Sequence, residues 1–406
     1  MTIKTDIKKG EDRGEQPTSM EPLLISESSR HRGALQDIAV ELAAKAAGFR
    51  RSLPARMQNS LSDMVRTMNC YYSNLIEGHD THPISAERAM NNDYSKDPKK
   101  RNLQLEARAH ITVQKWIDEG NLKGIALQPE SLREIHKRFC DLLPPEMLFV
   151  EDPDTKERIP VIPGEWRHRD VAVGGHVAVS PGAVERFLQR FEGIFGRLGK
   201  SESILAAAAA HHRLLWIHPF LDGNGRVARL MSHAVFLEVL DTGSLWSISR
   251  GLAKNVKAYK THLANCDLPR RNDLDGRGNL SEEALADFTR FFLETCLDQV
   301  TFMESLMQPD RLRARVLVWA EEEIKLGTLP AQTKPLLEAV LYRGELPRGD
   351  IPSLLGVGDR QARRIVSLLL EQNILAADTQ KAPLYLKFPA ALASRWMPGL
   401  FPEAEA

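Results

Sequence analysis

The sequence predicts a mainly α-helical protein with one small β-hairpin and a separate helical unit at its C-terminal end. Apolar residues recur at three- and four-residue steps over most of the chain, which is the period of an amphipathic helix. Alternating β-branched residues occur between residues 159 and 181. A break at Gly327 and Pro330 sets the last part of the chain apart, and 406 residues are enough for two or three domains.

Composition and charge exclude several classes of protein. Hydrophobic residues make up 43% of the chain and charged residues 27%, which is typical of a globular protein. The 54 lysines and arginines equal the 54 aspartates and glutamates, so no overall positive charge would hold nucleic acid non-specifically. The four cysteines lie far apart, which predicts neither a disulfide framework nor a cysteine-rich zinc site. We therefore expect a reducing compartment, the cytoplasm.

Neither a signal peptide nor a membrane span is expected. The stretch MTIKTDIKKGEDRGEQPTSM has no apolar core of the kind that a secretory signal needs. The longest apolar stretch, 204–210, is much shorter than the roughly 20 residues that span a membrane. The predicted protein is soluble and has no membrane partner.

Changes in composition predict how the chain divides into segments. The first 30 residues are polar, charged and proline-containing, which predicts a flexible N-terminus. The expected segments are this flexible N-terminus (1–30), N-terminal helices (31–100), a central helical domain (101–308), a linker helix (309–330), a helix-turn-helix unit (331–390) and a C-terminal tail (391–406).

Helical spacing and end signals predict the individual helices. The helix over 54–77 has Pro54 in its first turn and Gly78 as a left-handed stop. Ser281 is placed to cap the helix that follows it. The expected helices cover 35–49, 54–77, 102–118, 129–141, 183–198, 203–216, 226–240, 252–264 and 281–307.

Two shorter segments have other patterns. Valines at 171, 173, 177 and 179 alternate around a Gly-Gly pair, which predicts a hairpin within 159–180. The stretch RNDLDGRGNLSEE has calcium-like spacing at Asp273, Asp275 and Asn279. However, Arg277 and Ala284 stand where an EF-hand loop needs ligands, so we interpret this stretch as a capping loop.

The segment WIHPFLDGNGRVARLM, from residue 216 to 231, carries the chemistry. Apolar helical sequence lies on both sides of a turn in which Gly223 and Gly225 flank Asn224. Such glycines allow left-handed backbone, which turns N–H groups inward. The following helix adds its free N–H groups and positive dipole end. Arg226 and Arg229 project from one side of that helix, so the segment predicts a cradle for a polyphosphate.

Three further residues of the segment complete a reaction site. The ordinary pKa of a histidine near 6.5 makes His218 suitable as a general base. Asp222 offers the kind of oxygen ligand that Mg²⁺ takes beside phosphates. Phe220 is expected to anchor the turn in the core. A base, a metal carboxylate and a phosphate cradle predict attack by a hydroxyl on a nucleotide phosphate.

The segment HPFLDGNGRVAR at 218–229 resembles the signature HPFx(D/E)GNGRxxR of the Fic family and matches each specified position. The similarity covers about 55–305. It implies a mainly α fold, a Fic helical bundle with a small β-hairpin flap. It also implies transfer of AMP from ATP, with Mg²⁺, to a Ser, Thr or Tyr hydroxyl of a target protein, and it leaves a homodimer possible.

The resemblance also implies roles for individual residues. His218 would be the base and Asp222 the magnesium ligand, while a packing role for Tyr259 stays equally open. The resemblance implies that Gly223, Asn224 and Gly225 bind phosphate oxygens through backbone and amide donors, and that Arg226 and Arg229 neutralise the β and γ phosphates. It implies that Asn255, Tyr259 and Asp267 contact the nucleoside. It also implies a target flap that contains Gly164, Trp166 and Arg167.

The segment YYSNLIEGHD at 71–80 fits the family's inhibitory pattern (S/T)xxxE(G/N), with Ser73, Glu77 and Gly78. Glu77 stands in the last turn of a helix, where the helix dipole disfavours a carboxylate unless a cation offsets it. The family implies that this cation is Arg229, which is then unavailable to the γ phosphate. The sequence thus predicts a built-in brake.

The segment 331–390 resembles a winged helix-turn-helix. A Gly356-Val357-Gly358 turn precedes a helix that presents Arg360, Gln361, Arg363 and Arg364. Eight lysines and arginines against six acidic residues give this segment a net charge of only +2. DNA binding through 331–390 and docking of a protein both stay open.

Three functions are compatible with these observations. The first is an autoinhibited AMP transferase, the second a hydrolase that removes AMP on the same site, and the third a DNA-binding regulator that senses nucleotide. The remaining histidines are expected to be structural: His79 and His82 in a solvated loop, His211 and His212 packed or exposed on a helix.

Overall fold

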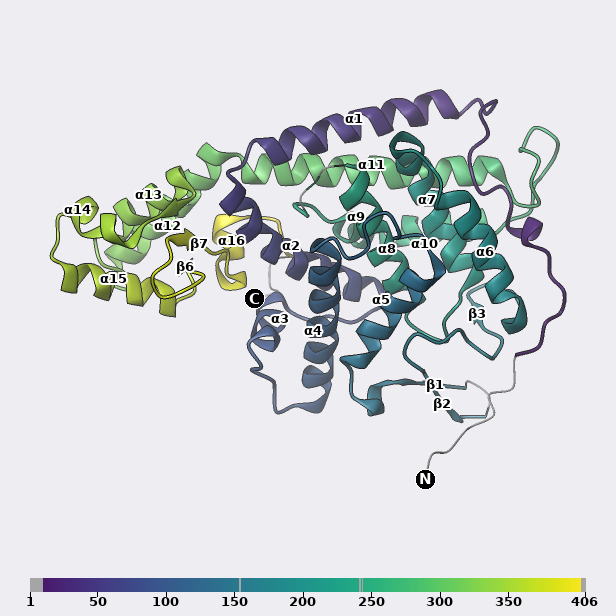
Figure 1. Cartoon of the computed structure of the whole chain (residues 1–406), viewed down its shortest axis with the longest axis horizontal. Coiled ribbons are helices and arrows are strands. Elements are labelled where there is room, and N and C mark those ends of the chain that lie inside the picture. Colours follow the sequence, from purple (N-terminus) through teal and green to yellow (C-terminus); the bar gives the residue numbers. More distant parts are fainter. Residues whose placement is uncertain (1–9, 153–154, 241, 243, 403–406) are drawn as a thin grey trace.

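A computed structural model of the protein describes residues 10–152, 155–240, 242 and 244–402, and within them the fold is mainly helical, as predicted (Figure 1). The helices are α1 (Arg32–Arg51), α2 (Ala55–Ile76), α3 (Pro83–Met90), α4 (Pro98–Asp118), α5 (Pro129–Asp141), α6 (Val184–Phe195), α7 (Lys200–Ile217), α8 (Asn224–Val239), α9 (Ile248–Lys254), α10 (Val256–Cys266), α11 (Glu282–Met307), α12 (Pro309–Lys325), α13 (Thr333–Arg343), α14 (Ile351–Leu355), α15 (Asp359–Glu371) and α16 (Ala393–Trp396). The strands are β1 (Phe149–Glu151), β2 (Arg158–Pro160), β3 (Ala172–Val173), β4 (His176–Val177), β5 (Glu345–Leu346), β6 (Leu375–Ala376) and β7 (Leu384–Leu386).

Helices α7 and α8 form the centre of the larger part of the molecule. They pack against each other along their lengths and are joined by the short turn at 218–223. Helices α1 and α11 run side by side along one edge, and α11 also contacts α7 and α10 (Figure 1). Helix α2 crosses the other side of this core and contacts α4 and α9. The turn is therefore held between rigid helices.

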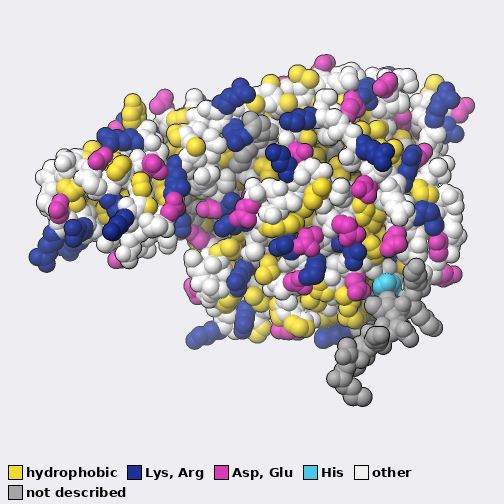
Figure 2. Space-filling model, in the orientation of Figure 1, with side chains coloured by type: hydrophobic (Ala, Val, Ile, Leu, Met, Phe, Trp, Pro, Cys, Tyr) yellow, Lys and Arg dark blue, Asp and Glu magenta, His cyan; other side chains and the backbone are white. Residues whose placement is uncertain are grey.

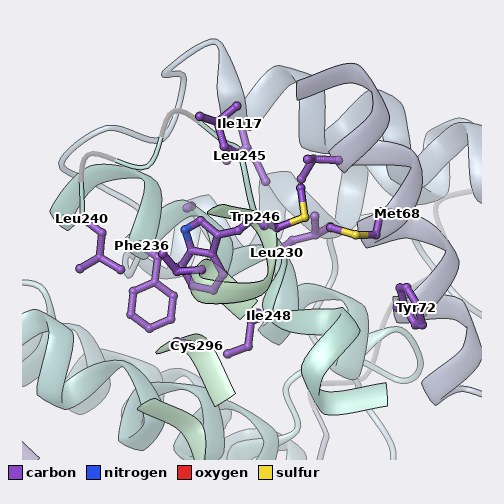
Figure 3. Close-up of a cluster of buried hydrophobic side chains, with 14 of the residues drawn as sticks. Met68, Tyr72, Ile117, Leu230, Phe236, Leu240, Leu245, Trp246, Ile248 and Cys296 are labelled. Carbon is purple, nitrogen blue, oxygen red and sulfur yellow. The ribbon is translucent and has the colours of Figure 1, made fainter. Parts of the chain in front are cut away.

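Apolar side chains from distant helices form one continuous core. Figure 3 shows a part of it, where Met68 of α2, Leu230 of α8 and Ile248 of α9 converge with Trp246 and Cys296. All five side chains are buried. This packing fixes the position of α2 relative to α8, which matters because both helices contribute to the site described below.

The segment 159–180 was predicted to form one hairpin, but it contains the end of one hairpin and the whole of a second. The first pairs β1 with β2 and places Val150 opposite Ile159. The second pairs β3 with β4 around Gly174 and Gly175, as the Gly-Gly signal predicts. The segment between the two hairpins has no strand, so the predicted flap residues Gly164, Trp166 and Arg167 lie outside both hairpins.

The prediction of a flexible N-terminus is wrong for residues 10–30; residues 1–9 lie outside the described part of the chain. Met20 and Leu23 are buried in the main core. Asp12 forms an ion pair with Arg186 at 2.9 Å, and Glu21 pairs with Arg190 at 2.6 Å. A few well-placed apolar residues and ion pairs thus outweigh the polar average composition that predicted disorder.

The C-terminal unit projects from one end of the molecule (Figure 1). Its elements follow the order α13, β5, α14, α15, β6, β7, and its small antiparallel sheet has the order β5-β7-β6. The winged helix-turn-helix assignment itself stays a prediction. The tail packs back on the protein. Trp396 is buried, and its ring centre lies 5.1 Å from the ring centre of Trp319. The Tyr72 hydroxyl of α2 donates to the Leu400 carbonyl at 2.9 Å.

The loop at 268–281 behaves as a capping loop. The buried Asp275 carboxylate accepts hydrogen bonds from the Ser281 hydroxyl and the Glu283 backbone N–H, at 2.8 and 2.9 Å. It thereby stabilises the N-terminus of α11. In the described part of the chain, no helix has the length and apolar character needed to cross a membrane.

Candidate active site

The turn between α7 and α8 has the backbone geometry of an anion cradle. His218 ends α7 with φ 51° and ψ 60°, and Gly223 precedes α8 with φ 80°. The first helical bond runs from Val227 N to the Gly223 carbonyl, so the N–H groups of residues 224–226 precede the hydrogen-bond ladder of α8. These N–H groups lie beside a cavity of about 490 Å³ that His218, Asp222 and Arg226 line.

His218 is oriented and kept neutral by its surroundings. Its Nδ1 lies 3.2 Å from the Leu215 carbonyl, which only accepts, so Nδ1 carries the proton and Nε2 is left as the base. Burial lowers the pKa of His218 to about 4, although the bond to Leu215 opposes this shift. The ring is therefore unprotonated at neutral pH and able to accept a proton.

Asn224 holds the turn together through its side-chain amide. Its Oδ1 accepts from the Phe220 N–H at 3.0 Å, and its Nδ2 donates to the Phe220 carbonyl at 2.8 Å. Only one of the two N–H groups of Nδ2 is used in this way, so the amide contact to phosphate stays a prediction. The backbone N–H groups of Asn224 and Gly225 remain the donors of the cradle.

Asp222 is the exposed carboxylate of the turn and lines the cavity. Among the described residues, no group of three or more His, Cys, Asp and Glu side chains could hold a metal ion by itself. Mg²⁺ is usually bound by one or two carboxylates together with phosphate oxygens and water. The residues present therefore fit Mg²⁺ only in company with a phosphate ligand.

Arg229 is bound by both side chains of the predicted inhibitory pattern. Its Nε donates to the Ser73 hydroxyl at 2.8 Å, and its Nη2 lies 2.5 Å from Oε1 of Glu77. The Arg229 side chain is 2% exposed. Burial raises the pKa of Glu77, but the charge and hydrogen bond of Arg229 outweigh this and hold it below its ordinary value. Glu77 is thus an anion placed against one of the two predicted phosphate arginines.

The other predicted phosphate arginine, Arg226, has a partner that the sequence did not reveal. Its Nη2 lies 3.4 Å from Oε2 of Glu106 on α4, and its guanidinium lies 5.1 Å from the centre of the Phe139 ring. His79 also binds Glu106, at 2.8 Å, and lines the cavity. The prediction that His79 is merely solvated is therefore wrong. The sequence offered one signal for Glu106: it is a charged residue on the face of α4 that carries the buried side chains.

The predicted flap residue Arg167 is structural. It is 3% exposed, and its guanidinium donates to the carbonyls of Ile217, Val179 and, at 2.7 Å, His218. Burial lowers its pKa to about 10. Because its donors are occupied by backbone carbonyls of Ile217, His218 and Val179, Arg167 fixes the position of the turn between α7 and α8 and is not available to a target peptide.

The other two flap residues pack behind the turn. Trp166 lies 4.9 Å from the ring of Phe220, which anchors the turn in the core as predicted. The Gly164 N–H donates to Nδ1 of His136 at 2.9 Å. His136 itself stacks on Phe220 with ring centres 4.0 Å apart, and burial lowers its pKa to about 4. This neutral histidine in the cavity wall was not predicted from the sequence.

The three predicted nucleoside contacts do not line the cavity. Asn255 binds the Gly251 carbonyl at 3.3 Å, and Asp267 lies 3.0 Å from Nε2 of His212. The Tyr259 hydroxyl lies 2.7 Å from Nε2 of His211 and is buried. The nucleoside assignments of Asn255 and Asp267 stay predictions, and the burial of Tyr259 supports its packing role. His211 and His212 are buried, one of the two alternatives expected.

Comparison with known proteins bears on this geometry. Residues 126–236, which include the whole turn between α7 and α8, match the sequence profile of the Fic/DOC family. The chain contains a Fic domain. In this Fic domain His218 and residues 222–227 line the cavity from one side, while Glu77 reaches it from the residue that follows α2, outside the matched region.

Relatives of this Fic domain occur among insect proteins. The chain is 30% identical over 173 residues to protein adenylyltransferase Fic of Drosophila erecta, a match that covers 41% of this chain and 31% of that protein. The same protein of Drosophila yakuba is 28% identical over 169 residues, which cover 41% of this chain and 31% of the relative. The chain thus spans about a third of the length of these curated relatives.

A solved structure shares the fold. Fic-1 from C. elegans superimposes with a TM-score of 0.50 at 16% sequence identity, over 68% of this chain and 74% of that chain. At this identity the likeness concerns the arrangement of helices alone.

Proposed function

We propose that the protein is an autoinhibited protein adenylyltransferase, which moves AMP from ATP to a Ser, Thr or Tyr hydroxyl of a target protein and of itself. The observation that carries the proposal is one cavity in which a neutral His218, the carboxylate of Asp222 and the N-terminus of α8 meet. The names of the Drosophila relatives support the same activity.

His218 acts as the general base in this proposal. Its Nε2 accepts the proton of the target hydroxyl, whose oxygen attacks the α phosphorus of ATP. The bond between the α phosphorus and the oxygen that bridges to the β phosphorus breaks, and pyrophosphate leaves with the electron pair. The products are an AMP ester of the target and pyrophosphate. The contact between Nδ1 and the Leu215 carbonyl keeps Nε2 turned to the cavity throughout.

The turn and its two arginines hold the triphosphate. The free N–H groups at the start of α8 bind phosphate oxygens, and Arg226 and Arg229 neutralise the β and γ phosphates. Asp222 would hold Mg²⁺, which when bound neutralises charge on the phosphates. With the β and γ phosphates bound in this way, the α phosphorus faces His218.

Glu77 is the brake. It occupies Arg229, and its own negative charge lies where the γ phosphate would need a cation. ATP then binds without the contact that aligns its α phosphorus for attack. Since Arg229 is buried, release requires the end of α2 to move, and a ligand or partner that favours this movement would activate the enzyme.

Intact mass spectrometry tests the proposal. The wild type and the variants Glu77→Gly and His218→Ala are incubated with ATP and Mg²⁺, and we expect the mass of one AMP to be added to Glu77→Gly only. Glu119→Gly is the matched control, because Glu119 follows the end of α4 as Glu77 follows the end of α2, yet only Glu77 of the two forms an ion pair with an arginine among the described residues. A gain of phosphate in place of AMP, or equal labelling of His218→Ala, would refute the proposed reaction.

The hydrolase alternative is separated by the same variants. If the enzyme removed AMP with a water held by Glu77, Glu77→Gly would lose the ability to release AMP from a modified substrate while gaining no labelling.

We also propose a cytoplasmic location, because Cys70, Cys140, Cys266 and Cys296 are all free and buried.

A second function is favoured by the surface of the C-terminal unit. The outer face of α15 exposes Arg360, Arg363 and Arg364, and Figure 2 shows Lys and Arg side chains gathered at that end of the molecule. We propose that this face binds DNA. Fluorescence anisotropy with a labelled duplex should show binding that weakens steeply with salt and is lost in Arg363→Glu. Salt-independent binding, or binding that survives in Arg363→Glu, would contradict a DNA contact through this face.

A further inference from the structure

The second phosphate arginine depends on a carboxylate that belongs to neither sequence motif. Glu106 lies on α4, and its Oε2 is 3.4 Å from Nη2 of Arg226. Both side chains are largely buried, with 12% of Glu106 and 10% of Arg226 exposed. Both also line the cavity, so this ion pair lies at the edge of the site where the triphosphate is proposed to bind.

The rest of the Arg226 guanidinium is poorly fixed by other groups. Its Nε is buried and has no hydrogen-bond partner among the described residues, and Phe139 supports only its face. Arg229, in contrast, is held at Nε and Nη2 by Ser73 and Glu77. The orientation of Arg226 therefore depends on Glu106 more than on any other side chain.

His79 fixes the carboxylate in turn. Its Nδ1 lies 2.8 Å from Oε2 of Glu106. Because a carboxylate only accepts, Nδ1 carries the proton and donates it, so the contact of 3.4 Å between Nδ1 and Arg226 is not a hydrogen bond. The three side chains are thus linked in one order: His79 donates a hydrogen bond to Glu106, and Glu106 forms an ion pair with Arg226.

We propose that Glu106 is a positioning residue that aims the Arg226 guanidinium at the triphosphate, and that His79 holds Glu106 in place. The inference rests on the proposed function of the site. A carboxylate that uses one nitrogen of a guanidinium leaves its remaining N–H groups free for phosphate oxygens, and it restricts their direction before the ligand arrives. Glu106 is therefore distinct from Glu77, which lies in the path of the phosphate.

The test uses the Glu77→Gly background, in which the brake is absent. Glu106→Gln keeps the shape of the side chain but removes its charge. We expect the KM for ATP to rise about tenfold, because Arg226 loses the ion pair that directs it, while kcat changes less than about twofold. Glu119→Gln is the matched control, since Glu119 is exposed, and its KM should not change. An unchanged or lower KM in Glu106→Gln would overturn the proposal.

A double-mutant cycle separates positioning from a general structural effect. If Glu106 acts through Arg226, Glu106→Gln should add little to the KM of an Arg226→Gln variant. His79→Ala should raise KM less than Glu106→Gln and should not add to it. His82→Ala is the control in the same loop, because His82 is exposed and caps α3 through the Ile84 N–H. Full additivity of Glu106→Gln and Arg226→Gln would overturn the proposal.

Calorimetry distinguishes failure of this inference from failure of the proposed function. The binding of ATP with Mg²⁺ is measured directly for Glu77→Gly with and without Glu106→Gln. If no AMP is ever transferred but Glu106→Gln weakens ATP binding about tenfold, the positioning role stands and the reaction is wrong. If AMP is transferred and ATP binding is unchanged, the reaction stands and the positioning role is wrong.

Discussion

Oε1 of Glu77 lies 2.5 Å from Nη2 of Arg229, and the same guanidinium donates from Nε to the Ser73 hydroxyl one turn earlier on α2. One helix thus binds the arginine of another helix through two side chains spaced four residues apart. The Arg229 side chain is 2% exposed and that of Glu77 is 37% exposed, so water reaches the pair only from the Glu77 side. The pair is a specific contact between α2 and α8, which the packing of both helices holds in register.

Removing the Ser73 hydroxyl is expected to loosen this contact without removing the proposed brake. Ser73→Ala deletes one hydrogen bond to a charged group, so self-AMPylation should rise about three- to tenfold above the wild type and stay below that of Glu77→Gly. The measurement is incorporation of labelled AMP with time. Ser60→Ala is the control on the same helix, because the Ser60 hydroxyl donates to the Arg56 carbonyl and, among the described residues, to no side chain. Wild-type labelling by Ser73→Ala would contradict a role for Ser73.

Gly225 allows the close approach of Glu77 to the turn. A Cβ at this position would lie 2.5 Å from Oε1 of Glu77 and 3.1 Å from Nη1 of Arg229. Gly225→Ala should therefore lower the stability of the wild type by about 1–3 kcal/mol, the usual cost of overpacking. The loss should be much smaller in Glu77→Gly, because the clashing carboxylate is gone. Urea unfolding of the four proteins measures this, and equal losses in both backgrounds would contradict the predicted clash.

Buried histidines are expected to make the fold sensitive to acid. Burial lowers the pKa of His110 and His211 to about 3 and of His136, His212 and His218 to about 4, against 6.5 for the exposed group. The unfolded chain therefore binds more protons between these values and 6.5. Stability should be fully present above pH 6.5 and decline as the pH falls toward 4.

The measurement is the urea midpoint between pH 7.5 and 5, with His110→Leu as the informative variant. Both ring nitrogens of His110 are buried without hydrogen-bond partners among the described residues, so an apolar replacement forfeits no hydrogen bond seen there. We expect His110→Leu to show a shallower loss of stability with falling pH than the wild type. Parallel pH profiles for the two proteins would show that His110 does not contribute.

The C-terminal tail is expected to stabilise α2, the helix that precedes Glu77. The Tyr72 hydroxyl donates to the Leu400 carbonyl at 2.9 Å, Arg250 donates to the Gly399 carbonyl at 2.7 Å, and the Leu400 side chain is buried. Leu400→Ala should cost about 2–4 kcal/mol and raise self-AMPylation, since Tyr72 lies one residue before Ser73. Pro402→Ala, at the exposed end of the described tail, is the control. Unchanged stability of Leu400→Ala would contradict this packing.

Local rules could predict much of the fold and the turn. Helical spacing located the long helices, the Gly-Gly pair located the β3–β4 turn, and residues 218–229 indicated an anion cradle through their glycines and arginines alone. These features depend on residues that are close neighbours in the sequence, within about one helical turn. The sequence alone is therefore enough to predict them. The disorder expected for residues 10–30 failed because average composition ignores where single apolar residues such as Met20 can be buried.

Long-range partners were decided by the tertiary structure alone. By itself, the sequence determined the helices, the turn and the types of group that His218, Asp222 and Arg226 bring to it. That Arg167 donates to carbonyls of the turn, that Tyr259 faces His211, and that Glu106 lies against Arg226 depends on how α4, α7, α8 and α10 pack. Packing is set by the summed burial of many side chains over the whole core, a quantity that no local spacing contains.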